Sequence, residues 1–180
     1  MSKVFTSAVV IIPPDSEWNS IQEIREKYDR NFHRWIPHIT LIYPFRPEIE
    51  FNQIEASFRE VCRNLSSFDI KLKEFKYFHH RKQIYTLWLD PEPSKSIIEL
   101  QHRIQLIVPD CNDVALHKGG YTPHLSLGQI YGKESLDQLI KSVSSHWKTI
   151  HFNLDKIYFI SRKPNINSSF EVKKLISLAN

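Results

Sequence analysis

The sequence predicts an α+β protein of two lobes related by a pseudo-two-fold axis, each lobe an antiparallel sheet with helices packed outside. Two observations support this fold class. The stretch Trp35–Leu41 (WIPHITL) returns as Tyr121–Leu127 (YTPHLSL), with the two histidines 86 residues apart. The order of predicted elements also repeats, because each half reads strand, helix, histidine strand, helix, strand. We therefore expect the two histidine strands to face a central cleft.

The first half begins with residues 4–12, which are rich in Val and Ile and predict a buried strand. A helix follows a polar start at Asp15, because apolar side chains recur at helical spacing: Trp18, Ile21, Ile24 and Tyr28. The first histidine strand covers about 38–43 and is closed by Pro44. A second helical stripe spans 52–65: Ile54, Phe58, Val61 and Leu65.

A strand begins at Phe68, and a shift in its alternation before Phe75 indicates a bulge. The second half starts with a strand over 83–90, paired with the previous one across the basic turn 79–82. A helix follows and ends before Pro109, with this apolar stripe: Ile97, Leu100, Ile104 and Ile107.

The second histidine strand covers about 124–130. A fourth helix carries the stripe Leu136, Leu139, Ile140, Val143 and Trp147. Strands at about 150–160 and 169–176 complete the pattern, and no linker or low-complexity segment separates the halves. We expect residues 1–180 to form a single bilobal domain and a monomer.

Composition is that of a globular protein and is compatible with a phosphate-bearing partner without requiring one. Of the 180 residues, 41% are hydrophobic and 24% charged, and the net charge of +4 is too small and dispersed for a long duplex-binding surface. Cys62 and Cys111 have no metal-ligand spacing, which indicates a reduced, intracellular chain. The apolar run 8–12 is too short for a signal peptide or a membrane span. The expected location is the cytoplasm, with the nucleus as an open alternative.

The repeated motif predicts catalytic residues. In each copy a histidine and a hydroxyl residue stand two apart, so on a strand both side chains lie on one face. His38 and His124 can share acid and base roles near neutral pH, while Thr40 and Ser126 can donate hydrogen bonds to phosphate oxygens. A single such motif is more often a strand edge or a buried histidine, but the second copy favours catalysis. This chemistry needs no metal or cofactor.

These residues resemble the paired motifs of the two-histidine phosphoesterase superfamily, the 2′-5′ RNA ligase-like proteins. His38–Leu41 with its extension Ile42–Phe45 is similar to the first signature, and His124–Leu127 is similar to the second, with serine where threonine is more usual. The motif separation and the element order agree as well. One departure concerns phosphate binding, because Gly128-Gln129 stands where many relatives carry a basic residue.

The resemblance implies a metal-independent phosphodiesterase that opens 2′,3′-cyclic phosphates to 2′-phosphates, acting on RNA ends or small nucleotides. Cleavage of 2′-5′ linked oligonucleotides and ligation of 2′-5′ RNA ends are alternatives within the same chemistry. A non-catalytic module that binds RNA ends is a further alternative, although it would not need two proton-transfer groups. The near symmetry of the motifs leaves open which histidine is the acid and which the base.

Residues flanking the motifs are candidates for substrate binding. Tyr43, Phe45 and Tyr121 could stack on a base, and Lys118 could meet a phosphate. Core packing is an equal alternative for Phe45, and a solvated loop position is one for Lys118. All four glycines lie between Gly119 and Gly132, where they allow either close approach to a ligand or turns and a bulge. The turn 79–82 could contact RNA or lie exposed.

Overall fold

The structure is a computed structural model that describes residues 2–116, 119–165 and 167–179. It is an α+β fold around one curled antiparallel sheet of eight strands in the order β6-β3-β4-β5-β2-β1-β7-β8. The strands are β1 (Ser7–Ile11), β2 (Ile39–Ile42), β3 (Phe68–His79), β4 (Ile84–Glu92), β5 (Leu125–Tyr131), β6 (Ile150–Leu154), β7 (Lys156–Ser161) and β8 (Glu171–Ser177).

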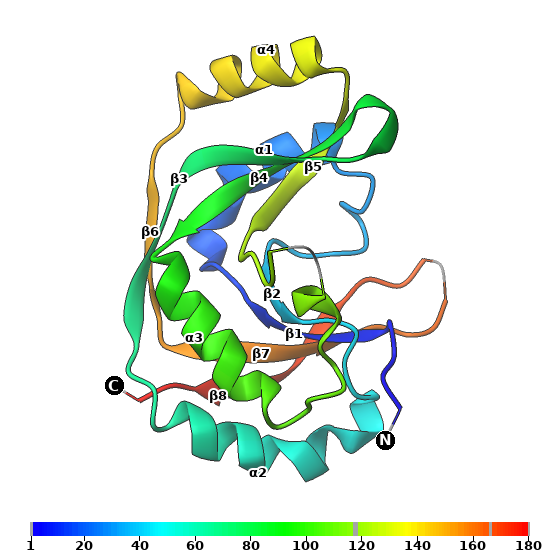
Figure 1. Ribbon diagram of the computed structural model, residues 1–180, viewed down its shortest axis with the longest axis vertical. Coiled ribbons are helices and arrows are strands. Elements are labelled where there is room, and N and C mark those ends of the chain that lie inside the picture. The colour runs from blue at the N-terminus through cyan, green and yellow to red at the C-terminus, as the bar shows by residue number, and fades with distance from the viewer. Residues whose placement is uncertain (1, 117–118, 166, 180) are drawn as a thin grey trace.

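The four predicted helices are present as α1 (Trp18–Tyr28), α2 (Phe51–Cys62), α3 (Ser94–Gln105) and α4 (Lys133–Ser144). Figure 1 shows α2 and α4 at opposite ends of the molecule, with α3 in front of the sheet. The α+β class, the antiparallel sheet and the outer helices are thus confirmed. Among the described residues, no helix is both long and apolar enough to cross a membrane.

The halves of the sheet are not the halves of the sequence. β3 pairs with β4 and β6, so it leaves the first half of the chain to join the second. In exchange, β7 pairs with β1 and extends the sheet with β8. The single strand expected over 150–160 turns at Asp155, and its two parts, β6 and β7, lie at different ends of the strand order. Each half-sheet therefore combines strands from both halves of the sequence.

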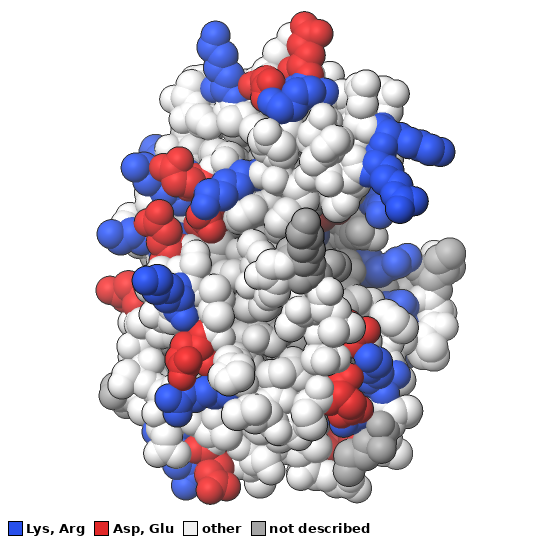
Figure 2. Space-filling model, in the orientation of Figure 1, with Lys and Arg blue, Asp and Glu red and all other residues white. Residues whose placement is uncertain are grey.

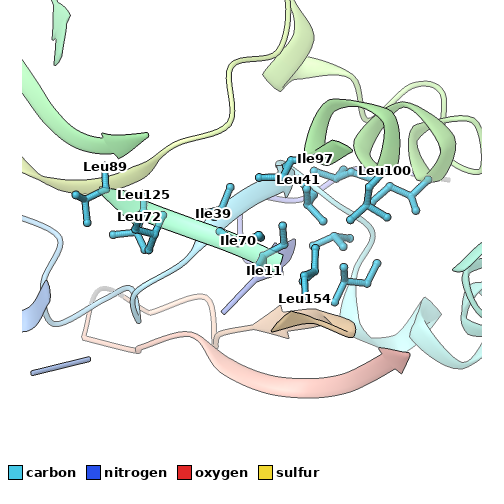
Figure 3. Close-up of a cluster of buried hydrophobic side chains, with 14 of the residues drawn as sticks. Ile11, Ile39, Leu41, Ile70, Leu72, Leu89, Ile97, Leu100, Leu125 and Leu154 are labelled. Atoms are coloured by element: carbon cyan, nitrogen blue, oxygen red, sulfur yellow. The ribbon is translucent and has the colours of Figure 1, made fainter. Parts of the chain in front are cut away.

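The histidine strands are neighbours at the centre of the sheet, joined by the single pair Ile39–Leu125. Both of these side chains are fully buried, which contributes roughly 1.5–3 kcal/mol each to stability. Figure 3 shows that core side chains from both half-sheets converge with α3: Ile11, Ile39, Leu41, Ile70, Leu72, Leu89, Ile97, Leu100, Leu125 and Leu154. The core therefore packs against one face of the sheet at the Ile39–Leu125 pair and fixes the two histidine strands in place.

The bulge expected between Leu72 and Phe75 is confirmed by a register shift between Leu72 and Glu74 where β3 pairs with β4. Gly128 in β5 serves helix packing. A Cβ there would lie 2.5 Å from Cβ of Tyr28, and the backbone has φ +155°. The end of α1 therefore rests directly on β5, so Gly128 allows the close approach of a helix, which neither sequence-based explanation includes. At Gly119 and Gly120, an added Cβ would have no described atom within 4 Å apart from those of its chain neighbours.

Candidate active site

The register of β2 and β5 brings the four predicted catalytic side chains together. Because Ile39 pairs with Leu125 in an antiparallel ladder, one step in each direction places His38 opposite Ser126 and Thr40 opposite His124. Directly opposite residues have Cβ atoms about 5 Å apart. The side chains of Ile39 and Leu125 fill the core, so the four motif side chains share the other face. Each histidine thus faces the hydroxyl of the other motif.

Both imidazole rings are held in the same way by the backbone. Nδ1 of His38 lies 2.6 Å from the carbonyl oxygen of Ile36, and Nδ1 of His124 lies 2.8 Å from that of Thr122. A carbonyl only accepts, so in the neutral rings Nδ1 carries the hydrogen and Nε2 carries the lone pair. A neutral ring can therefore take a proton at Nε2, and a charged ring can give one from the same atom.

His38 is half-buried, with aromatic rings packed on one side. The indole of Trp35 stacks on its ring at 4.6 Å between centroids, and Phe170 stacks on the same indole at 3.8 Å. The pKa of His38 is lowered to about 4, mainly because burial disfavours the charged ring and also because of the nearby charges of Arg25 and His124. The bond to the Ile36 carbonyl acts in the opposite direction. His38 is therefore neutral at pH 7, with the lone pair of Nε2 available.

A buried ion pair lies beside His38. Nε and Nη2 of Arg25 donate to Oδ2 of Asp29 at 3.0 and 2.8 Å, and Nη2 also donates to the carbonyl oxygen of Trp35. The two side chains are 2% and 5% exposed, so removing either partner would leave a buried charge uncompensated. The pair fixes the segment that carries His38. The sequence signal for it was their i, i+4 spacing at the end of the predicted helix.

A pocket of about 150 Å³ opens at this ion pair, lined by Arg25, Asp29, Asn31, Trp35, His38, Ser126 and Gln129. Gln129 accepts a hydrogen bond from the backbone N–H of Arg30, so it contributes to the wall. Arg25 brings a cationic side chain into the pocket that Gln129 also lines. This arginine stands on α1, far in sequence from the second motif.

His124 has aromatic neighbours of a different kind. The rings of Phe78 and Trp88 stack on each other at 4.9 Å, and each presents to His124 at a steep angle, with centroids 5.0 and 5.8 Å away. Nζ of Lys76 lies 5.9 Å from the centroid of the Trp88 indole. Neither Phe78 nor Trp88 stands out in the sequence as a site residue. Both lie in strands with alternating apolar side chains, a pattern that is also typical of core residues.

The predicted substrate-binding residues separate into different roles. The hydroxyl of Tyr121 donates a hydrogen bond to the carbonyl oxygen of Thr40 at 2.7 Å, which connects the second motif to the first. Burial raises the pKa of this hydroxyl. Tyr43 is half-buried, bonds to the carbonyl of Phe5 and packs against Trp35. Phe45 is fully buried in the aromatic core, so the expected stacking of Phe45 on a base is wrong. Lys118 lies outside the described residues.

A larger cavity of about 660 Å³ lies beyond Trp35, where β1 ends and β6 turns into β7. None of the four motif side chains lines it, although Ile36 and Phe170 do. Its charged lining is mainly acidic: Asp15, Asp155 and Glu171, against Lys156. Among the described residues, no group of three or more His, Cys, Asp or Glu could hold a metal ion.

Comparison with known structures gives the same fold. Escherichia coli LigT complexed with 3′-AMP superposes with a TM-score of 0.63 at 11% identity, covering 97% of this chain and 98% of LigT. A protein from Thermus thermophilus superposes with a TM-score of 0.62 at 14% identity, covering 96% of this chain and 97% of that protein. The similarity at these identities concerns the fold, and it extends over nearly the whole chain.

Sequence comparison adds the family. A Bacillus pumilus protein named "Putative phosphoesterase" is 27% identical over 97 residues, which are 53% of this chain and 56% of that protein. The match thus spans little more than half of that relative. A Geobacillus kaustophilus protein of the same description is 25% identical over 130 residues, 67% of each chain. The pattern that defines the 2′-5′ RNA ligase superfamily matches residues 13–165, so the chain belongs to this superfamily of two-histidine phosphoesterases.

Proposed function

We propose that the protein is a phosphodiesterase that opens 2′,3′-cyclic phosphates at the ends of RNA or on nucleotides, leaving a 2′-phosphate, without a metal. The observation that carries this proposal is the central register, which sets two Nδ1-anchored imidazoles across from two hydroxyls on one face. The 3′-AMP and phosphate complexes of LigT are consistent with a nucleotide phosphate as ligand in this fold.

In the proposed reaction, His38 is the base and His124 the acid. Nε2 of neutral His38 takes a proton from a water molecule whose oxygen forms a new bond to phosphorus. The bond from phosphorus to O3′ breaks, and Nε2–H of protonated His124 gives its proton to O3′. The lowered pKa of His38 supports this assignment, because a base must be unprotonated at the working pH. Exchange with solvent then restores both protonation states.

Thr40 and Ser126 stabilise the charge that develops on the phosphate. Each hydroxyl lies opposite a histidine in the register, so both can donate to non-bridging oxygens of a phosphate held between the rings. Such donors stabilise the transition state because they already point to where negative charge accumulates. Neither hydroxyl acts as the nucleophile in this scheme.

The test is an assay in EDTA with 2′,3′-cyclic mononucleotides, RNA oligonucleotides ending in a cyclic phosphate, and 2′-5′ oligoadenylate. Phosphorus NMR distinguishes a 2′-phosphate product from a 3′-phosphate. We expect wild-type turnover of the cyclic phosphates that disappears in His38→Ala and His124→Ala and persists in His102→Ala, an exposed histidine of α3. Turnover of 2′-5′ oligoadenylate alone would reassign the substrate, and binding without turnover would identify an RNA-end binding module.

A further inference from the structure

The face that carries Ser126 continues across β4 onto β3. Trp88 of β4 pairs with Ser126 on one side and with Lys76 on the other. The next row on this face contains Gln129, Thr86 and Phe78, paired in the same way. A continuous surface therefore leads from His124 along the β3–β4 hairpin. We call residues 76–88 the hairpin arm.

The inner part of the hairpin arm is aromatic. Phe78 and Trp88 stack on each other and border His124, and Lys76 pairs with Asp90 beside them. Stacked aromatic rings next to cations are the usual platform on which proteins bind single-stranded nucleic acids, because every base has a face that can stack. The Phe78 side chain is partly accessible to solvent, whereas the Trp88 side chain is 5% exposed and stacks against the Phe78 ring.

The tip of the hairpin arm is basic and held in an unusual backbone conformation. Lys82 and Gln83 both have left-handed backbones, with φ of 60° and 58°, a conformation that costs non-glycine residues free energy and tends to occur at functional sites. Hydrogen bonds lock it, because the N–H of His80 donates to Ile84 and the N–H of Gly132 donates to Gln83. The tip is thus fixed in one shape.

The charge at this tip is not neutralised by the protein. Among the ion pairs of the described residues, none includes Arg81 or Lys82, and both side chains are exposed. Figure 2 shows blue side chains at upper right, where the hairpin ends in Figure 1, with no acidic side chain beside them on that face. β3 ends at His79 and residues 81–83 form a turn, so the tip lies beyond Phe78 by less than the roughly 13 Å that four fully extended residues would span.

We propose that the hairpin arm binds the sugar–phosphate backbone of single-stranded RNA whose cyclic-phosphate end lies between the two histidines. This inference rests on the proposed function and specifies its substrate as an oligonucleotide. Phe78 offers a stacking surface to a base near the reacting end, and the Arg81 and Lys82 side chains meet phosphates farther along the strand. The mainly acidic cavity beyond Trp35 disfavours the same backbone on the opposite side.

The experiment compares two substrates in three proteins. The substrates are a cyclic-phosphate mononucleotide and a pentanucleotide ending in a cyclic phosphate. The proteins are wild type, the double variant Arg81→Ala/Lys82→Ala, and the matched control Lys27→Ala/Lys95→Ala, which removes two exposed charges from α1 and α3. We expect wild type to prefer the pentanucleotide. The hairpin variant should lower the ratio of kcat/KM values, pentanucleotide over mononucleotide, about tenfold, and the control should leave it unchanged.

Salt dependence and rescue sharpen the result. Losing two phosphate contacts should reduce the slope of log(kcat/KM) against log salt for the pentanucleotide by about 1.4. Arg81→Lys/Lys82→Arg should restore both the ratio and the slope. An unchanged ratio in the hairpin variant, or an equal fall in the control, would overturn the inference and leave the proposed function intact.

Binding separates this inference from the proposed function. If wild type turns over neither substrate, the proposed function fails, and the fluorescence anisotropy of a labelled pentanucleotide then tests the hairpin arm alone. Weaker binding in the hairpin variant than in the control would still support an RNA surface. Equal binding in all three proteins, or none at low salt, would reject it.

Discussion

His38 is enclosed between the indole of Trp35 and a buried ion pair, whereas His124 lies against aromatic edges beside a surface lysine. The strand position, the i, i+2 hydroxyl and the Nδ1 bond to a carbonyl are the same in both. The backbone therefore holds two equivalent imidazoles, and their neighbours make them unequal. The lowered pKa of His38 is the clearest result of that difference.

The largest effect is expected when one of the two histidines is removed. Replacing either histidine with alanine should lower kcat for cyclic-phosphate opening by about 10²–10⁴-fold, because each loses a proton transfer in the transition state. The double variant should be little worse than the more damaged single variant, since the two act in one step. Additive losses in single-turnover assays would mean that the histidines act independently.

The second-largest effect is expected from removing the hydroxyl of Thr40 or of Ser126. Thr40→Val and Ser126→Ala should each lower kcat about 10²-fold, because each removes one donor to the developing phosphate charge. Both changes keep the side chain near its original size, so melting temperatures should stay close to wild type. A loss that appears only in KM would instead assign the hydroxyls to ground-state binding.

The low pKa of His38 also predicts how stability depends on pH. In the unfolded chain a histidine titrates near 6.5, whereas folded His38 titrates at about 4. As pH falls from 6.5 to 4 the unfolded state therefore takes up the proton first, and the free energy of unfolding falls by up to about 3 kcal/mol. Urea unfolding between pH 4 and 7 should show this fall in wild type and in His102→Gln. In His38→Gln the fall should be smaller, and an identical pH dependence would contradict the shifted pKa.

The smallest effect is expected from changing an aromatic neighbour of a histidine, which tests whether Trp35 lowers the pKa of His38. Trp35→Leu opens the His38 ring to solvent, so its pKa should rise toward 6.5, moving the acid limb of the kcat/KM profile upward by about one unit. NMR titration of the His38 ring gives the same pKa directly. The matched change Phe78→Leu, beside His124, should leave this limb in place. An acid limb that follows Phe78→Leu and ignores Trp35→Leu would reverse the assignment of base and acid.

Local patterns were enough to predict the four helices, the α+β class and the bulge near Leu72, because each depends on neighbouring residues. The motif likewise predicted that His38, Thr40, His124 and Ser126 would share one face, which follows from strand alternation. Strand exchange was missed, since nothing near Phe68 or Asp155 encodes which strand lies beside it. Arg25 and Trp88 were missed for the same reason, because long-range packing alone brings them to the histidines.

Strand exchange makes the two ends of the chain depend on each other. Neither half-sheet can form from one half of the sequence, because β3 completes the half-sheet of β4, β5 and β6 while β7 and β8 complete that of β1 and β2. A chain cut at the exposed tip between Arg81 and Lys82 would give two fragments, each lacking strands that the other holds. Such fragments should be unfolded when alone and regain the active site only when mixed, as in a split-protein reporter whose signal is the reaction itself.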